Sequence, residues 1–172
     1  MALSMFGACS TRGAKPETLV PDFSVTSPVD GKVFKLSDAK GKYVALHFLL
    51  KTECPFCLKH TRDYATQSAG TSDVVQIFLK PDSADEIKSW ASKVNGPAGK
   101  SAVTIYRDAD ATLARRFSIP DGYAFHGQSV HYPALVLIDP KGKEAFRYVG
   151  KSKTDRLPYE KFAAKLAELR RP

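Results

Sequence analysis

Two cysteines that lie three residues apart, Cys54 and Cys57, are the residues of this chain best suited to chemistry. They follow an apolar run at residues 43–50, which predicts a buried strand, and they precede a helical pattern. A helix that begins at Cys54 or Pro55 places the Cys54 sulfur beside unpaired N–H groups that favour a thiolate. Cys57 then lies one turn along, within reach of a mixed disulfide formed at Cys54. This spacing is what dithiol–disulfide exchange requires.

Two other interpretations of the pair remain open from the residues alone. A C-x-x-C pair is half of many zinc sites, although a second pair at short spacing is missing here. The residues left to complete a zinc site are His47, His60, His126, His131 and Cys9. Both cysteines could also be inert core residues, because free cysteine is often buried. Proline between them favours redox chemistry, since proline suits the first turn of a helix.

Length and composition predict one domain with its own hydrophobic core. The chain has 172 residues, is 43% hydrophobic and contains ten phenylalanines. Domains are typically about 100–200 residues long, so a second one is not expected. Three cysteines exclude a secreted disulfide framework, and no apolar run approaches the roughly 18 residues of a membrane span.

The net charge is +8, and it gathers toward the C-terminus. Residues 141–172 hold ten Lys and Arg against four acidic residues, a net charge of 10 − 4 = +6. Such a stretch is either a basic surface for an acidic partner or the solvated face of a hairpin and a terminal helix. No nucleic-acid-binding motif accompanies it, so we expect the solvated face and no nucleic-acid partner.

Residues 1–15 lack periodicity, and we expect a flexible N-terminal segment before a domain at residues 16–172. Residues 3–10 resemble the end of a bacterial lipoprotein signal, in which small residues precede a lipidated cysteine, here Cys9. The hydrophobic region is too short, however, and a basic n-region is missing. If the segment is a signal remnant, the protein is periplasmic or anchored through a lipid at Cys9; otherwise we expect it in the cytoplasm.

Strands alternate with helices along the chain. We expect a hairpin around Asp30-Gly31, strands at 43–50, 74–79, 103–106 and 134–139, and an edge strand at 144–149. Helices are expected at 54–68, after a capping box at Ser83 and Glu86, through Leu113 and Phe117, and from Tyr159 to Leu169. Residues 120–131 are expected to be a loop. This order predicts an α/β fold with a central mixed sheet and helices on both faces.

Several motifs occur in an order that resembles the thioredoxin-fold redoxins. They are Pro21-Asp22-Phe23, Asp30-Gly31-Lys32, Leu36-Ser37-Asp38, Lys40-Gly41-Lys42, Cys54-Pro55-Phe56-Cys57 and the run 133–139. The superfamily includes thiol–disulfide oxidoreductases and the alkyl hydroperoxide reductase type of peroxiredoxin. The resemblance covers about Lys15 to Leu169 and implies a thioredoxin-like fold. The redox unit it implies is the dithiol itself, with no metal and no organic cofactor.

The resemblance also implies roles for individual residues. Cys54 resembles the attacking cysteine and Cys57 the resolving one. Pro133 lies just before a strand, where the family has a cis-proline packed against the disulfide, and Tyr132 would line the site where a partner chain pairs. The function implied is a thiol–disulfide oxidoreductase that exchanges with a protein disulfide or dithiol.

The residues that flank the cysteines depart from the thioredoxin pattern. Glu53 precedes Cys54 and Phe56 follows Pro55, where thioredoxins usually have tryptophan or glycine. A carboxylate beside Cys54 opposes the thiolate and should raise the thiol pKa. We therefore expect a reducing couple. Thr52, Glu53, Pro55 and Phe56 are expected to shape the site.

A peroxiredoxin-type peroxidase acting through Cys54, or a non-catalytic binding module on the same fold, are the alternative functions. The peroxidatic motif has a hydroxyl residue three positions before the cysteine and a proline seven before it. This chain has Lys51 and His47 at those positions, with Thr52 one place late. The activating arginine of such a peroxidase would be Arg115 or Arg116.

His47 has two interpretations. It falls near the place where thioredoxins bury a carboxylate behind the disulfide, and a histidine can act as a base near neutral pH. It is otherwise a core histidine whose ring is hydrogen-bonded. His126 and His131 either overhang the site or are ordinary loop residues.

Overall fold

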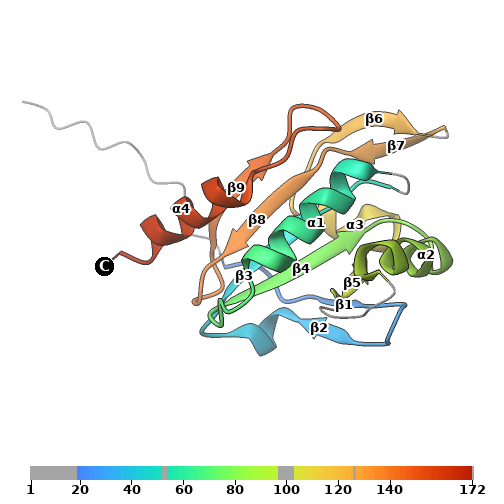
Figure 1. Cartoon of the computed structure of the whole chain (residues 1–172). Helices are drawn as coiled ribbons and strands as arrows, with labels where there is room; N and C mark the ends of the chain where they lie inside the picture. The colour runs from blue at the N-terminus through green and yellow to red at the C-terminus, as the bar shows by residue number, and fades with distance from the viewer. Residues whose placement is uncertain (1–18, 52–53, 97–102, 126, 172) are drawn as a thin grey trace, which may run out of the picture.

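The computed structural model describes residues 19–51, 54–96, 103–125 and 127–171. Seven strands form one sheet in the order β2-β1-β5-β4-β3-β8-β9 (Figure 1). The strands are β1 (Ser24–Thr26), β2 (Val33–Lys35), β3 (Tyr43–Phe48), β4 (Val74–Lys80), β5 (Ile105–Arg107), β8 (Ala134–Ile138) and β9 (Glu144–Val149). The helices are α1 (Pro55–Gln67), α2 (Ala84–Asn95), α3 (Thr112–Arg116) and α4 (Tyr159–Leu169), with short 3-10 turns at Leu36–Ala39 and Ala109–Ala111.

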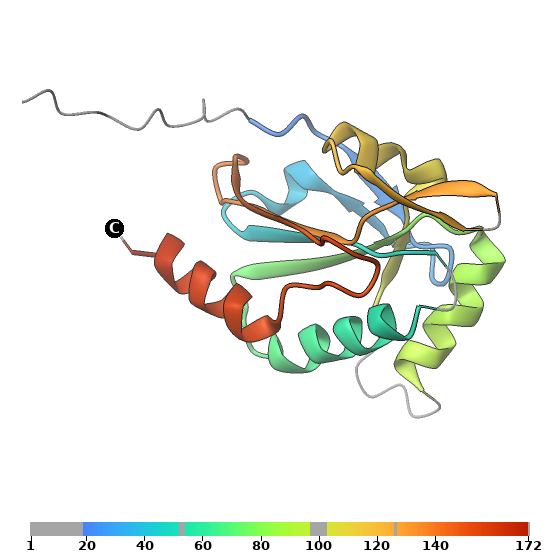
Figure 2. The ribbon, with the colours of Figure 1, turned by 90° about the horizontal axis from the view of Figure 1, so that it is seen from above.

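The sheet is mixed, as expected. β3, an interior strand, pairs in parallel with β4 and antiparallel with β8. Every residue of β3 and β8 is buried, which explains why both sequences are almost continuously apolar. Figure 2 shows α1, α2 and α4 along one face and α3 on the other. The chain therefore has the predicted α/β fold with helices on both faces.

Local signals predicted several elements correctly. The β1–β2 hairpin pairs Ser24 with Lys35, and Gly31 in its turn has a φ of 71°. Helix α2 begins with the predicted capping box, in which Ser83 and Glu86 exchange side-chain to backbone hydrogen bonds. Its buried residues follow the predicted spacing: Ile87, Trp90, Ala91 and Val94.

The expectation of a loop at residues 120–131 is wrong. Two further strands, β6 (Asp121–Phe125) and β7 (Gln128–His131), form a separate antiparallel pair. Alternate residues Tyr123 and Phe125 pack against the core, and Gly127 between the strands has a φ of 73°. Glycines, histidines and a register shift between Asp121 and Tyr123 hide this alternation in the sequence.

The predictions for Cys9 and the N-terminal segment fall on residues 1–18, which lie outside the described residues. They remain predictions. Within the described part of the chain, no helix is both long and apolar enough to cross a membrane.

Candidate active site

The two cysteines lie at the start of α1, which follows β3 in the chain. Cys54 is the N-cap of α1, and Pro55 occupies the first helical turn, where its missing N–H is not needed. The backbone N–H of Cys57 donates to the Cys54 sulfur over 3.1 Å. The two Cα atoms are 5.2 Å apart and the sulfurs lie within disulfide-bonding reach. The helix start expected from the sequence is therefore confirmed.

The two sulfurs differ in their surroundings. Cys57 is fully buried and faces the core beneath α1, whereas Cys54 is partly exposed. Phe56, which lies between them in the sequence, is 49% exposed although it is a large apolar residue. Thr52 and Glu53, predicted to shape the site, lie outside the described residues.

Arg156 contacts both sulfurs. One of its terminal nitrogens, Nη2, lies 3.3 Å from Cys54 Sγ and 3.0 Å from Cys57 Sγ. Burial lowers the pKa of Arg156 to about 10, while Tyr123 and Asp155 act in the opposite direction. The guanidinium is therefore charged at neutral pH, and a cation at this distance stabilises a thiolate.

The segment between β9 and α4 holds Arg156 in place. Asp155 accepts hydrogen bonds from the Tyr148 hydroxyl and from the backbone N–H of Lys151. Gly150 passes so close to this turn that a Cβ would lie 2.4 Å from the carbonyl oxygen of Asp155. A glycine is therefore required there, and the packed turn fixes the direction of Arg156.

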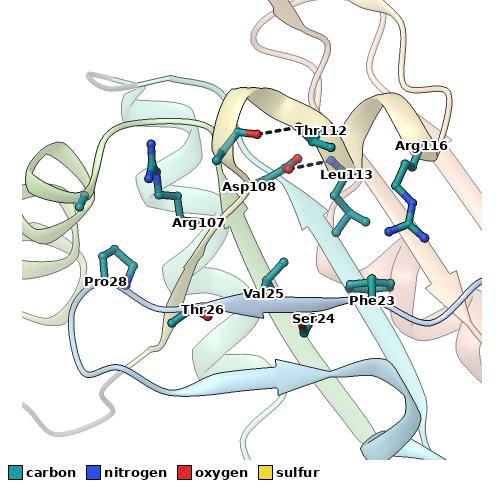
Figure 3. A pocket seen from close by; sticks show the side chains of 12 residues that line it. Phe23, Ser24, Val25, Thr26, Pro28, Arg107, Asp108, Thr112, Leu113 and Arg116 are labelled. Carbon is teal, nitrogen blue, oxygen red and sulfur yellow. Dashed lines mark hydrogen bonds between the residues drawn. The ribbon is translucent and has the colours of Figure 1, made fainter.

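This arginine is not one that the sequence suggested. Arg115 donates to the carbonyl of Asp110, and Arg116 donates to the carbonyl of Asp22. Arg116 and Phe23 line a hollow of about 500 Å³ between β1 and α3, and Figure 3 shows the side chains around it. The basic stretch 141–172 is also not uniformly a solvated face, because Arg156 within it turns inward to the cysteines.

The structure corrects one expectation about Pro133. No cis peptide bond occurs among the described residues, so the bond between Tyr132 and Pro133 is trans. Trans is the state that an X–Pro bond favours by itself, and the packing here does not impose the other. Pro133 nevertheless lines a small cavity together with His60 and with Arg156, the residue that contacts both sulfurs. The Tyr132 ring lies against Gly122 of β6, where a Cβ would be 2.5 Å from it.

His47 proves to be a core histidine with both ring nitrogens bonded. Its Nδ1 lies 2.9 Å from Nε2 of His60, and its Nε2 lies 2.7 Å from Oε1 of Gln76. Burial lowers the pKa of His47 to about 4, and it lowers the pKa of His60 well below its usual range. Both rings are therefore neutral near pH 7, and His47 is too weak a base to take a thiol proton readily.

The β6–β7 hairpin lies beside the active-site segment. Lys51 donates to the side-chain oxygen of Gln128 on β7. Tyr123 and Phe125, like Cys54, pack against the core cluster that contains Cys57. His131 is buried and its Nδ1 donates to the Tyr132 carbonyl, so it does not overhang the site. His126 lies outside the described residues.

Within the described residues, no group of three His, Cys, Asp or Glu side chains is arranged to hold a metal ion. Among the described residues, the polar groups with a hydrogen bond to a cysteine sulfur are the Arg156 guanidinium and the backbone N–H of Cys57 in the first turn of α1.

Comparison with known proteins identifies the family of this chain. The model of the AhpC/TSA family matches residues 16–145, which is most of the chain. The chain belongs to the AhpC/TSA family. Among curated relatives of this redoxin, peroxiredoxin-2 of Bos taurus is 31% identical over 139 residues, which are 78% of this chain and 67% of the relative. Peroxiredoxin Bcp of Bacillus subtilis is 36% identical over 69 residues, 39% of this chain and 44% of that protein.

Solved structures share the fold of this redoxin. A peroxiredoxin-like protein from Aquifex aeolicus superposes with a TM-score of 0.72 at 19% identity, covering 92% of this chain and 90% of that one. A protein described as the thiol:disulfide interchange protein DsbE from Chlorobium tepidum gives 0.65 at 20% identity, covering 91% and 97%. The chain therefore has the thioredoxin-like fold, which both peroxiredoxins and disulfide oxidoreductases use.

Proposed function

We propose that this redoxin is a thiol–disulfide oxidoreductase whose Cys54–Cys57 dithiol exchanges with protein disulfides. The observation that carries the proposal is the cysteine pair itself, within bonding reach across the first turn of α1. A second cysteine at this place gives the first a resolving partner inside the same helix. No metal or organic cofactor is required for this chemistry.

The proposed reaction has two exchange steps. The Cys54 thiolate, stabilised by the helix N-terminus and by Arg156, attacks one sulfur of the substrate disulfide. The other substrate sulfur leaves as a thiolate and takes a proton from solvent. Cys57 then loses its proton and attacks Cys54 in the mixed disulfide. The substrate is reduced to two thiols, the pair is oxidised to a disulfide, and an external dithiol must reduce it again.

The surroundings support a protein as the substrate. Phe56 presents an exposed apolar ring beside Cys54, which suits contact with a partner chain. Pro133 lines a small cavity together with Arg156, and Tyr132 precedes it in the chain. We propose that these two residues shape the surface where the partner docks.

The decisive experiment measures the reduction of insulin disulfides with dithiothreitol as the electron donor. The wild-type protein should accelerate the reaction, Cys54→Ser should be inactive, and Cys57→Ser should accumulate a mixed disulfide detectable by mass spectrometry. Cys9→Ser serves as the matched control and should behave as the wild type. No acceleration by the wild-type protein would contradict the proposal, and would favour a binding module.

A peroxidase is the second candidate, favoured by the peroxiredoxin relatives and by the arginine at Cys54. The residues at the positions of the peroxidatic motif argue against it. Both ring nitrogens of the buried His47 are hydrogen-bonded, and Lys51 donates a hydrogen bond to Gln128. We therefore expect peroxide to oxidise Cys54 no faster than an ordinary thiol. Stopped-flow fluorescence of the single tryptophan, Trp90, can measure that rate. A rate far above that of free cysteine would reverse the order of the two candidates.

A further inference from the structure

A buried lysine lies under the active-site segment. Lys80 ends β4, and its side chain has no exposed surface. Its ammonium group donates to the Leu50 carbonyl over 2.6 Å and lies 3.3 Å from a carboxylate oxygen of Asp82, which is equally buried. The ammonium also lies 4.6 Å from the centre of the Trp90 ring on α2.

Such a pair is not explained by stability. Removing two charges from water is expensive, and an apolar pair of similar size often serves a core at least as well. Burial lowers the pKa of Lys80, and the attraction of Asp82 opposes that change. The neighbouring inward positions of the sheet, such as Phe78 and Leu49, are apolar. Lys80 thus calls for a reason other than packing.

The group that Lys80 holds suggests the reason. β3 ends at Phe48, and just beyond it the Leu49 N–H still donates a hydrogen bond to the Leu79 carbonyl next to Lys80. The carbonyl of the following residue, Leu50, accepts a hydrogen bond from the Lys80 ammonium. Only three residues, 51–53, connect this anchored carbonyl to Cys54. The ammonium therefore fixes one end of the segment whose other end is the attacking cysteine.

We propose that Lys80, held by Asp82, is a positioning residue for the redox pair, because it anchors the Leu50 carbonyl and so sets where Cys54 meets the start of α1. The proposal rests on the proposed function in one respect, namely that Cys54 is the attacking thiol.

The test compares Lys80→Met with the double variant Lys80→Met/Asp82→Asn. The single variant leaves a buried carboxylate without its cation, so the double variant decides the matter if the single one does not fold. Alkylation of Cys54 by iodoacetamide is followed at several pH values by peptide mass spectrometry, alongside thermal unfolding. We expect the rate for Cys54 at pH 7 to fall about tenfold, as for a loss of thiolate equivalent to one pKa unit.

Val94→Ala is the matched control. Val94 is buried on the same helix as Trp90 and its truncation destabilises the core without touching Leu50. This control should lower the melting temperature and leave the Cys54 rate unchanged. If the Lys80 variants also keep the wild-type rate within about twofold, Lys80 is a core residue only and the proposal is overturned. The alkylation rate of Cys54 does not depend on turnover. An inactive wild-type protein would therefore contradict the proposed function, and the alkylation rates would still test the role of Lys80.

Discussion

The two faces of the central sheet bury different kinds of side chain. The face toward α3 is packed mainly by rings and aliphatic groups, such as Phe23, Phe48 and Phe117. Its buried carboxylate, Asp108, accepts hydrogen bonds from two N–H groups in the first turn of α3. The face beneath α1 and α2 buries His47 and Lys80 among its apolar residues. Both faces are well covered, so the difference is one of chemistry and not of exposure.

This difference separates stability from function. Apolar packing contributes free energy of folding roughly in proportion to buried area. Buried polar groups contribute little net stability, and each must find a partner within the protein. Two of the buried polar groups beneath α1 and α2 have partners near the active-site segment. Lys80 donates to the Leu50 carbonyl, and His60 lines a small cavity together with Arg156. We expect substitutions on the two faces to change different measurements.

The largest expected effect is on stability at the apolar face. Phe117→Ala removes a ring whose centre lies 6.1 Å from that of Phe23 and 5.7 Å from that of Phe48. The free energy of unfolding should fall by about 3–5 kcal/mol, as for other buried phenylalanines. Urea unfolding measures this change. The alkylation rate of Cys54 in the folded variant should match that of the wild type. A decrease of more than about threefold would contradict the separation of stability from function between the two faces.

The next effect concerns acid stability at the polar face. Burial lowers the pKa of His47 from 6.5 to about 4. Above pH 6.5 the ring is neutral in both states. As the pH falls from 6.5 to 4, only the unfolded state takes up the proton, so the free energy of unfolding falls by about 3 kcal/mol, at roughly 1.4 kcal/mol per pKa unit.

Urea unfolding at pH 7, 5.5 and 4 measures this loss. His47→Gln removes the titrating ring, so its stability should change less across this range than that of the wild type. His60 contributes in the same direction, which leaves part of the loss in the variant. An unchanged pH dependence in His47→Gln would show that His47 is not the group responsible.

A smaller effect in free energy, but a direct one on the chemistry, is expected at Arg156. Arg156→Met removes the cation that lies 3.0 Å from Cys57 Sγ and 3.3 Å from Cys54 Sγ. Because less of the thiol is then ionised, the alkylation rate of Cys54 at pH 7 should fall about tenfold. Stability should stay close to wild type, since the buried charge is itself costly. A wild-type rate would mean that the helix N-terminus alone activates Cys54.

The smallest effect is expected from Arg170→Met, which is the control for Arg156. Arg170 pairs with Asp73 on the surface, and both side chains are more than one third exposed. Exposed ion pairs contribute about 0–1 kcal/mol, so unfolding and Cys54 alkylation should both stay near wild type. A slowing comparable to that in Arg156→Met would show that net charge, and not the contact with sulfur, is responsible.

Features with local causes were predicted well from the sequence. The start of α1 at Pro55 follows from proline and an N-cap residue, and α2 follows from the Ser83 capping box and its apolar spacing. The buried strands β3 and β4 follow from continuous apolar runs. The placing of Cys54 at a helix N-terminus therefore needed no tertiary information.

Predictions that depended on packing were less accurate. The cis bond expected before Pro133 came from the family resemblance, and isomer choice is decided by packing around the proline. The β6–β7 pair was missed because its alternation is broken by a register shift. A charged residue closing the apolar run of β4 was a signal for Lys80, but its burial depends on Asp82 and on α2.

The sequence by itself determined the cysteine pair, its place at the start of a helix and the type of sheet behind it, because capping and periodicity act within a few residues. The tertiary structure alone decided which cation meets the sulfurs. Arg156 lies 102 residues from Cys54 in the chain, in a basic stretch whose other members resemble it in sequence. Only the packing of Gly150 and Asp155 turns this one inward, where low exposure makes its charge effective.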